Sequence, residues 1–324
     1  MVFSKDVLKI EPAVETAKIA DFVVEHARNT FRRRGVVVGL SGGIDSAVMA
    51  SLAVQAMGKE NVLGLIMPEK ESNPVSSSYA AAHAQKLGIE VKEVDLTDAV
   101  DAVGSYKQRD EFIASLIPEY TPECKYNIRL PTDLLERSAL NFYTLCVELP
   151  DGTIKKKRLD PSAFRALTSF ANIKIRSRMV RLYFEAETRS MVVAGTTNRT
   201  EFLLGDFCKF GDGGTDLEPL SHLYKDQIYQ IAEHLDVTED IRRRTPSPDT
   251  FSLPVSDQEF FFRIPFDKLD LLLYAWEHEV PTADAAITTD LDEEAIKRAF
   301  ADFSSKYRAT QHLRDLPYSL PFTQ

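Results

Sequence analysis

Short apolar runs alternate along the chain with longer segments whose apolar residues recur at helical spacing. The runs predict buried strands at residues 36–40, 62–67 and 191–195, and a further strand is expected at 91–96. Helical spacing predicts helices at residues 12–34, 47–57, 77–87 and 99–117. Strands and helices that alternate at such short distances require right-handed crossovers. The sequence therefore predicts an α/β fold with a doubly wound parallel sheet.

Residues 118–170 depart from this alternation. Two segments, 140–149 and 154–159, are separated by a turn that contains Asp-Gly, which predicts a β-hairpin. A helix is expected again from residue 172 to 186. We interpret 118–170 as an insert within a single domain that spans residues 1–324. The basic run Lys155–Arg158 in the second strand is either a solvated strand end or a contact for an anionic partner.

A second irregular segment covers residues 242–262. It contains three prolines between Pro246 and Pro254, then a run of three phenylalanines, and it has weak periodicity. Loops of this length in compact enzymes are usually functional or disordered. We predict a mobile lid here.

Composition narrows the class of partners. The 324 residues are 44% hydrophobic and 27% charged, with a formal net charge of −10. Binding to a nucleic-acid backbone needs a net basic face, so no nucleic-acid partner is expected. No apolar run approaches the length of a membrane span and no targeting pattern opens the chain, which predicts a cytoplasmic protein with no membrane partner. The cysteines Cys124, Cys146 and Cys208 share no close spacing, so neither a disulfide framework nor a zinc site is expected.

Candidate chemistry concentrates where the first predicted strand meets a helix, at Gly39-Leu-Ser-Gly-Gly-Ile-Asp-Ser46. Two adjacent glycines, Gly42 and Gly43, let backbone amides approach an anion without a Cβ in between. The helix N-terminus behind them adds the positive end of its dipole, and Ser41 and Ser46 add hydroxyl groups. The loop is therefore predicted to bind a phosphate or pyrophosphate.

Asp45 lies inside this predicted anion site, where its carboxylate would repel a phosphate. The position is reasonable only if a cation such as Mg²⁺ stands between the two charges. The lysine of a Walker A loop is absent. The loop therefore predicts Mg²⁺ with a polyphosphate.

Two further predicted strands end at the same edge of the sheet. Met67 follows one of them, and it either contacts an adenine base or packs in the core. The turn at residues 195–201 follows the other and repeats the strand-to-helix geometry of the phosphate loop. This repetition places Glu201 near the pyrophosphate.

The Ser41–Ser46 string resembles the pyrophosphate loop of N-type ATP pyrophosphatases. Four more motifs occur in the order and type expected of the NAD synthetase family: Asn-Ile-Lys-Ile-Arg-Ser-Arg-Met at 172–179, Gly-Thr-Thr-Asn-Arg-Thr-Glu at 195–201, Lys-Phe-Gly-Asp-Gly-Gly-Thr-Asp at 209–216 and Leu-Tyr-Lys at 223–225. This resemblance covers roughly residues 10–117 and 171–285 and leaves the insert unmatched. The predicted lid also lacks the Thr-Asp-Glu spelling common in compact members.

The resemblance implies a Rossmann-like fold of the adenine nucleotide alpha hydrolase type and the ATP-dependent amidation of nicotinic acid adenine dinucleotide to NAD. The implied ATP-binding residues are Gly39, Ser41, Gly42, Gly43, Ser46, Met67, Thr196 and Lys225. Asp45 and Glu201 would ligate Mg²⁺, and Arg176, Lys209 and Asp216 would bind the acid substrate. Asp45, Lys209, Asp212 and Lys225 are the implied catalytic residues.

The identity of the acid and the source of nitrogen are separate questions. The alternatives are an amide synthetase of the same type that acts on a different carboxylic acid, or a relative that keeps the fold without turnover. None of the three cysteines has the setting of a glutaminase nucleophile, so we expect ammonia as the donor, from solution or from a separate glutaminase. The resemblance also implies a homodimer.

Overall fold

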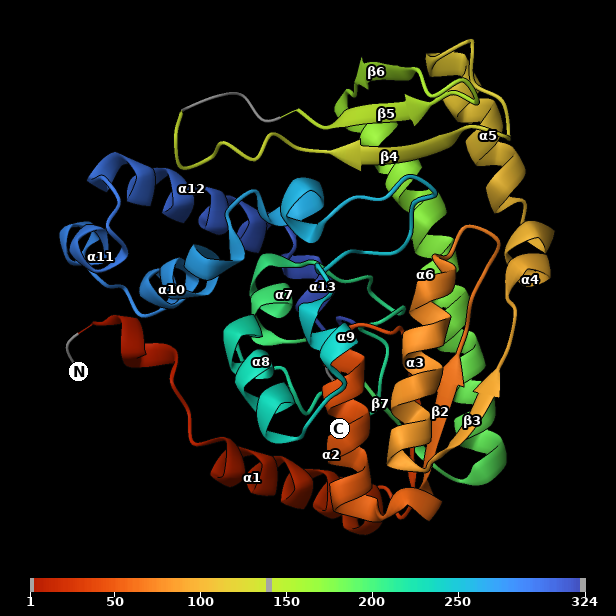
Figure 1. The fold of residues 1–324 in the computed structure, drawn as a ribbon, viewed down its shortest axis with the longest axis vertical. Helices are drawn as coiled ribbons and strands as arrows, with labels where there is room; N and C mark the ends of the chain where they lie inside the picture. The colour runs from red at the N-terminus through yellow and green to blue at the C-terminus, as the bar shows by residue number, and fades with distance from the viewer. Residues whose placement is uncertain (1–2, 138–141, 321–324) are drawn as a thin grey trace.

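The computed structural model describes residues 3–137 and 142–320. Its main sheet has four parallel strands in the order β3-β2-β1-β7 (Figure 1). These strands are β1 (Val36–Gly39), β2 (Val62–Ile66), β3 (Glu90–Glu93) and β7 (Val192–Ala194). β1 lies at the centre, with Val36 opposite Val62 of β2 on one side and Val192 of β7 on the other.

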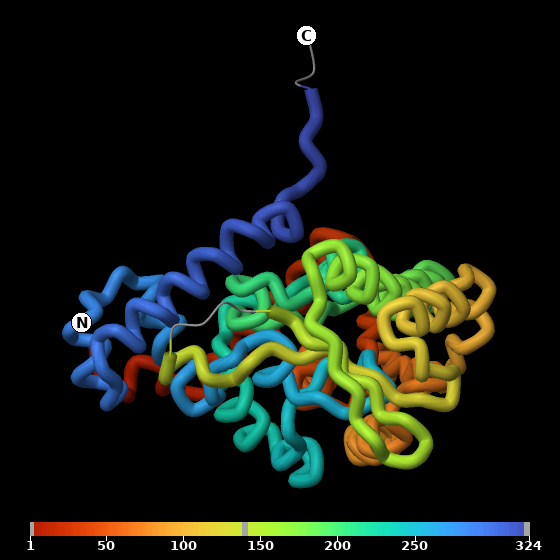
Figure 2. The backbone as a smooth tube through the Cα atoms, turned by 90° about the horizontal axis from the view of Figure 1, so that it is seen from above, coloured from red at the N-terminus to blue at the C-terminus, as the bar shows by residue number. Residues whose placement is uncertain are grey.

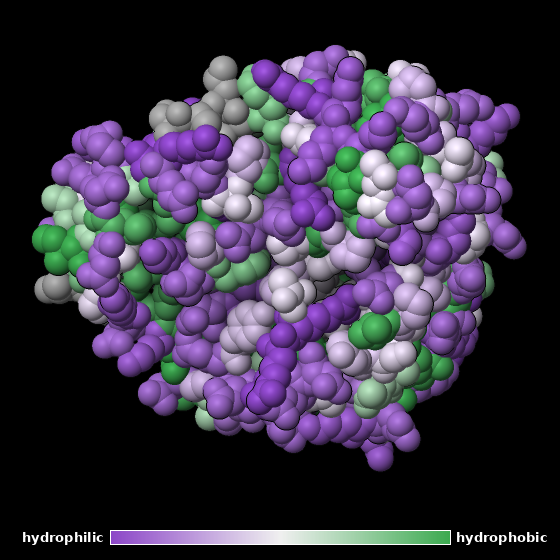
Figure 3. All heavy atoms as spheres, turned by 45° about the horizontal axis from the view of Figure 1, so that its top comes forward, coloured by the Kyte–Doolittle hydropathy of each residue, from purple (hydrophilic) through white to green (hydrophobic). Residues whose placement is uncertain are grey.

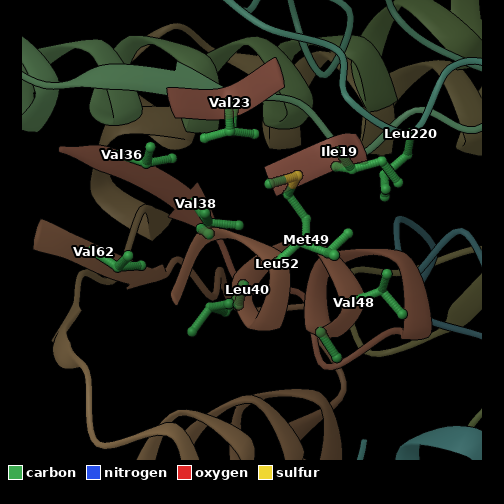
Figure 4. Packing of buried hydrophobic residues seen from close by; sticks show 14 of the residues in the cluster. Ile19, Val23, Val36, Val38, Leu40, Val48, Met49, Leu52, Val62 and Leu220 are labelled. Carbon is green, nitrogen blue, oxygen red and sulfur yellow. The ribbon is translucent and has the colours of Figure 1, made fainter. Parts of the chain in front are cut away.

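Successive residues of the central strand point to opposite, equally buried faces of the sheet. Val36 and Val38 pack with helices α1 (Pro12–Val24) and α2 (Ile44–Met57), as Figure 4 shows for Ile19, Val23 and Leu52. Val37 instead packs with residues of the long helix α6 (Pro161–Arg189). Helices on both faces of a parallel sheet confirm the predicted doubly wound α/β fold.

The remaining helices are α3 (Pro74–Leu87), α4 (Thr97–Ala102), α5 (Ser105–Leu116), α7 (Arg199–Leu204), α8 (Lys225–His234), α9 (Glu239–Arg243), α10 (Phe266–Glu277), α11 (Thr282–Thr289), α12 (Glu293–Ala309) and α13 (Gln311–Arg314), with the short turns η1 (Lys5–Leu8) and η3 (Lys59–Asn61). Some of the remaining helices follow the prediction with shifted boundaries, whereas α9 to α13 were not predicted. The helix predicted at 12–34 is α1 followed by a π-helical turn, η2 (Glu25–Thr30), and the helix predicted at 99–117 is divided at Gly104, which has a φ of 77°. A left-handed backbone ends a helix, and glycine adopts it without strain.

The insert is a three-stranded antiparallel sheet and is therefore larger than the predicted hairpin. β5 (Thr144–Glu148) and β6 (Ile154–Arg158) confirm the hairpin, although residues 140–141 of its first predicted strand lie outside the described part of the chain. β4 (Lys125–Arg129), which the prediction missed, pairs with β5. The helix expected from residue 172 begins earlier, because α6 starts at Pro161. Asp160 caps it by accepting a hydrogen bond from the Ala163 amide at 2.8 Å.

β4 carries part of the segment that was predicted to be a lid. Residues 244–257 have no regular structure and lead into the π-helical turn η4 (Gln258–Phe262). The Leu253 amide donates to the Tyr126 carbonyl of β4 at 2.9 Å, and Asn127 donates to the Pro254 carbonyl at 2.9 Å. Phe251 packs in the apolar cluster beneath the insert. The insert is therefore a platform for this segment.

Helices α10, α11 and α12 form a helical unit beside the sheet, and their apolar cluster also includes Leu203 and Leu204 of α7 and Tyr224. Beyond α13 the chain extends away from the body of the protein (Figure 2), and Leu316, Tyr318 and Leu320 are almost fully exposed. Polar side chains dominate the face drawn in Figure 3, with small apolar areas between them. Within residues 3–137 and 142–320, no helix has the length and apolar character needed to cross a bilayer.

Candidate active site

A cavity of about 1080 Å³ opens at the carboxyl ends of β1, β2 and β7. The loop after β1 forms its floor, α6 and the loop after β7 form two walls, and residues from the 244–257 segment form another. Ligands of open α/β sheets bind at this edge. The cavity is therefore where the predicted phosphate loop should act.

The phosphate loop is folded as its sequence predicts. Gly42 has a φ of 72°, and a Cβ at this position would lie 2.2 Å from the Ser76 carbonyl oxygen, so only glycine fits. The Ser41 and Ser46 hydroxyl oxygens are 3.1 Å apart. Gly43 precedes the first turn of α2 and makes no side-chain cap, which leaves the positive helix end facing the cavity floor.

A buried lysine joins the loops after β1 and β7. Lys225, at the first position of α8, donates from Nζ to Asp45 Oδ2 at 2.5 Å and to Glu201 Oε1 at 3.4 Å. Asn198 holds both acids, because its Nδ2 donates to Asp45 Oδ1 at 2.9 Å and its side chain forms a capping box with Glu201. Sequence motifs separated by 180 residues thus meet around one ammonium group.

The buried carboxylates around Lys225 outnumber its single positive charge, and this imbalance shifts the pKa values of the cluster. Burial raises the pKa of Glu201 well above its ordinary value, and the neighbouring Asp45 raises it further, while Lys225 opposes the shift. Burial likewise raises the pKa of Asp257 to about 6, against the opposing charge of Lys225. Although burial alone would lower the pKa of Lys225, Asp45 and Glu201 hold it well above its usual range. Additional positive charge would therefore stabilise these acids in their ionised forms.

The donor set fits a magnesium ion that is completed by substrate. Asp45 and Glu201 face the same nitrogen atom of Lys225, so their oxygens lie close together. Within the described residues, no group of three or more His, Cys, Asp or Glu side chains has the arrangement of a metal site. Mg²⁺ commonly uses only one or two carboxylates together with phosphate oxygens and water. The residues present are compatible with that mode of binding.

Most of the other predicted residues line the cavity. These are Gly39, Ser41, Gly43, Ser46, Met67, Thr196, Arg176, Lys209 and Asp212, together with Asp45, Glu201 and Lys225. Met67 is also buried among core residues of β2 and α6, which confirms the packing role, while its contact with an adenine base stays a prediction. Gly42 lies beneath the loop against Ser76 and supports its shape.

Two predicted substrate contacts have other partners in the structure. Lys209 Nζ donates to the carbonyl oxygens of His312 and Asp315, each at 2.7 Å. Asp216 accepts from the Val193 amide at 2.8 Å and from the Tyr183 hydroxyl at 3.1 Å, and it does not line the cavity. The structure therefore places Asp216 beside the edge strand β7, outside the residues that line the cavity, and its role in binding the acid stays a prediction.

Several cavity residues were missed by the motif reasoning. Arg244 donates to the Gly42 carbonyl at 3.2 Å and to Ser76 Oγ at 2.8 Å, so it connects the 244–257 segment to the phosphate loop. Asp257 and residues near the C-terminus, such as His312, also line the cavity. No sequence pattern marks them, because they reach the site only through the tertiary fold. Asn198 stood within a motif but had no assigned role.

The comparisons with known proteins agree with this geometry. The NAD synthase family model matches residues 15–116 and 108–317, and the second match includes the insert that the motifs left unmatched. The chain belongs to the NAD synthase family. An NH(3)-dependent NAD(+) synthetase of Rhizobium rhizogenes is 39% identical over 316 residues, which cover 97% of this chain and 94% of that protein.

Solved structures show the same fold. The NH3-dependent NAD synthetase of Campylobacter jejuni superposes with a TM-score of 0.63 at 25% identity, over 97% of this chain and 100% of that one. The NMN synthetase of Francisella tularensis superposes with a TM-score of 0.68 at 22% identity, over 97% of this chain and all of that one, which is a likeness of fold alone.

Proposed function

We propose that the protein is an ammonia-dependent NAD synthetase. The observation that carries this proposal is the convergence of Ser41, Ser46, Asp45, Glu201 and Lys225 in one cavity at the sheet's carboxyl edge. ATP is attacked at its α-phosphorus by the nicotinate carboxylate of the acid dinucleotide, which forms an acyl-adenylate and releases pyrophosphate. Ammonia then attacks the acyl carbon, AMP leaves, and a proton is lost to give the amide of NAD. Adenylation is needed because a free carboxylate is a poor acyl donor.

The phosphate loop and the Lys225 cluster divide the work of stabilising charge. The amides and hydroxyls of residues 41–46 hold the departing pyrophosphate at the helix N-terminus. Lys225 neutralises charge on the phosphates from the side of Asp45 and Glu201, which would hold Mg²⁺. When bound, the ion supplies Lewis-acid polarisation of the phosphate oxygens. Arg176 and Asp212 contact the acid substrate or ammonia on the opposite wall, and residues 242–262 act as a lid.

The exposed surface of α6 supports the proposal that the active form is a homodimer. Val180 and Phe184 are 62% and 54% exposed, and they follow Arg176 at spacings of one helical turn. Exposed apolar side chains that adjoin on one helix face are suited to an interface, and twofold dimers are the commonest assembly. Because Arg176 lines the cavity at the end of this face, a partner seated on it would adjoin the substrate. Light scattering that finds a fully active monomer at assay concentration would refute the dimer.

Ammonia as nitrogen donor is favoured by the state of the thiols. Cys208 lines the cavity, but burial raises its pKa to about 11, so it is a protonated thiol at neutral pH. Glutamine hydrolysis requires a thiolate. Ammonia would come from solution in the cytoplasm or from a separate glutaminase.

The deciding experiment supplies purified protein with the acid dinucleotide, MgATP and ammonium, and follows products by mass spectrometry. NAD, AMP and pyrophosphate are expected. The corresponding mononucleotide acid is tested in parallel, because a protein of this fold is an NMN synthetase by its published name. Preference for the mononucleotide would favour the alternative, an amide synthetase of the same type that acts on a different carboxylic acid. Formation of ADP and orthophosphate would refute adenylation of the acid. Turnover with glutamine in place of ammonium would refute ammonia as the nitrogen donor.

A further inference from the structure

A second buried ionic cluster lies behind the cavity walls and includes none of the residues assigned above. Its centre is Lys174 of α6, whose side chain is 2% exposed. Its Nζ donates to Glu69 Oε1 at 3.0 Å, to Glu71 Oε2, and to the Thr250 carbonyl oxygen at 3.1 Å. An ammonium group has three N–H donors, so every donor of Lys174 has a separate partner. We call Lys174, Glu69, Glu71 and the Thr250 carbonyl the Lys174 cluster.

In each carboxylate of the cluster, the oxygen that does not contact Lys174 accepts hydrogen bonds from other groups. Glu69 Oε2 accepts from the Tyr106 hydroxyl at 2.5 Å and from the Glu71 amide at 3.0 Å, while Glu71 Oε1 accepts from Arg109. Burial would raise the pKa of Glu69, but Lys174 and these hydrogen bonds outweigh it and lower that pKa. Hydrogen bonds from several directions therefore fix both carboxylates in position.

The cluster joins three separate parts of the cavity wall. Glu69 and Glu71 belong to the loop after β2, between Met67 and Ser72, which both line the cavity. Lys174 is one turn from Arg178 of α6, which donates to the Met67 carbonyl at 3.1 Å. Thr250 belongs to the 244–257 segment and lines the cavity, whereas Lys174, Glu69 and Glu71 do not. Lys174 thus holds the backbone of the proposed lid from behind.

A second set of contacts shows what this backbone contact positions. Asp249 accepts from Ser76 Oγ at 2.7 Å, directly before Thr250 in the chain. Arg244, at the start of the segment, contacts Ser76 and the phosphate loop. A shift of the Thr250 backbone would therefore be transmitted to groups that touch the Gly42 carbonyl.

We infer that Lys174 is a positioning residue that keeps residues 244–257 against the phosphate loop through the Thr250 carbonyl. Stability alone does not explain the cluster, since buried ion pairs can often be replaced by apolar residues without loss of stability. A lysine that reaches a lid carbonyl does supply a fixed geometry, and small misplacements in an active site can cost large factors in rate. The inference rests on the proposed function.

The test distinguishes the effect of losing the Lys174 contact with Thr250 from the effect of leaving a buried charge unpaired. Lys174→Met alone would leave Glu69 and Glu71 with an unpaired charge, so the main variant is Lys174→Met/Glu69→Gln, which removes one charge of each sign. Glu69→Gln is the matched control. Its amide oxygen takes the place of the Glu69 oxygen that accepts from Tyr106, and its amide nitrogen replaces the oxygen that accepts from Lys174, so this variant loses that one bond but keeps the Lys174 bonds to Glu71 and to the Thr250 carbonyl. We expect Glu69→Gln to keep kcat and the KM for ATP within about threefold, and the double variant to lose about tenfold or more in kcat/KM for ATP.

A readout other than turnover distinguishes positioning from general damage. Limited proteolysis should cut the double variant within residues 244–257 faster than wild type or Glu69→Gln, and MgATP should protect it less. Phe303→Leu, in an apolar cluster that contains no residue of the Lys174 cluster or of residues 244–257, provides a variant of reduced stability with no expected change in the rate of cleavage at 244–257 while folded. Wild-type NAD formation is established first, so failure of the proposed function is seen before any variant is made.

Equal kinetics and equal cleavage of the double variant and Glu69→Gln would overturn the inference. If the double variant does not fold, Lys174→Arg takes its place. Its guanidinium keeps the charge but cannot reproduce the three directions of the ammonium donors. We then expect folded protein with faster cleavage at 244–257 and raised KM for ATP, and wild-type values for both would overturn the inference equally.

Discussion

Two buried lysines, Lys225 and Lys174, each contact two carboxylates, but the other partners of those carboxylates differ. Each is at most 7% exposed and each donates to two carboxylates. Around Lys174 the acids are completed by a tyrosine, an arginine and backbone groups, and the pKa of Glu69 is lowered. Around Lys225 the acids line an open cavity, and the pKa of Glu201 is raised.

The difference distinguishes an ionic cluster whose charges are balanced inside the protein from one with an excess of buried acid. Groups whose hydrogen bonds are all made inside the protein fix a structure, because any movement costs a bond. Acids that keep raised pKa values at a cavity wall are stabilised when a cation arrives. Burial of a charged residue therefore does not by itself identify a ligand-binding site. Buried acids that line a cavity and keep a raised pKa do indicate one.

The largest expected effect follows from removing the lysine of the open cluster. Lys225→Met should lower kcat by about a thousandfold, because the phosphates lose a preorganised positive charge. The protein should still fold, since Glu201 already has a raised pKa and takes up a proton when its partner is lost. Steady-state kinetics with circular dichroism measure this, and turnover within tenfold of wild type would remove Lys225 from the mechanism.

Removing either acid of the same cluster should cost about a hundredfold or more. Asp45→Asn and Glu201→Gln keep the shape of each side chain and delete the negative charge that would hold Mg²⁺. The loss should be partly recovered by raising the Mg²⁺ concentration, because weaker binding of the ion is the cause. Near-normal turnover in both variants, with unchanged circular dichroism, would contradict the two-ligand arrangement.

The contrast between the clusters also explains how much could be predicted from sequence. The phosphate loop and Glu201 were predictable, because each lies in a local motif after a strand whose carboxyl end opens at the cavity, and Lys225 was predictable from the Leu-Tyr-Lys motif of the family resemblance. The Lys174 cluster was not, although Lys174 stands within a recognised motif. Its partners at positions 69, 71 and 250 share no local pattern with it and meet only through packing of β2, α6 and the 244–257 segment.

Some elements of the fold were likewise predictable from the sequence and others were not. The parallel sheet was predictable from three apolar runs, while β4 was missed because Lys125–Arg129 is a five-residue strand with charged ends. The true start of α6 was marked by Asp160 and Pro161, a capping pair that the weak apolar pattern obscured. The role of Asp216 in binding the acid stays a prediction, because an acid in a glycine-rich loop serves equally well as a ligand or as a backbone acceptor, and here it accepts from Val193.

A smaller effect is expected from Asp270, which supports Lys225 from behind. It accepts from the Thr200 hydroxyl and the Asp226 amide, each at 2.6 Å, and burial raises its pKa to about 6. Between its ordinary pKa near 3.8 and about 6, the folded form holds a proton that the unfolded form has lost, so this group's contribution to stability falls as pH rises through that window.

Asp270→Asn removes this titration. The free energy of unfolding of wild type relative to Asp270→Asn should therefore fall by about 2 kcal/mol as pH is raised from 4 to 7. Urea unfolding at a series of pH values measures the difference. A difference that is constant over this range, or that rises with pH, would show that Asp270 is ionised throughout.

The smallest effect is expected from a third lysine, which has the same kind of partner but is exposed to solvent. Lys155 of β6 contacts Glu119 at 2.9 Å, with both side chains about half exposed. Water and salt screen such a pair, and β6 is an edge strand, where lysine is a usual means of preventing sheet-to-sheet association. Lys155→Met should leave kcat, KM and the unfolding midpoint unchanged within error, in contrast to the same substitution at Lys225. Loss of activity in Lys155→Met would instead show that the basic run of the insert contacts an anionic substrate or partner.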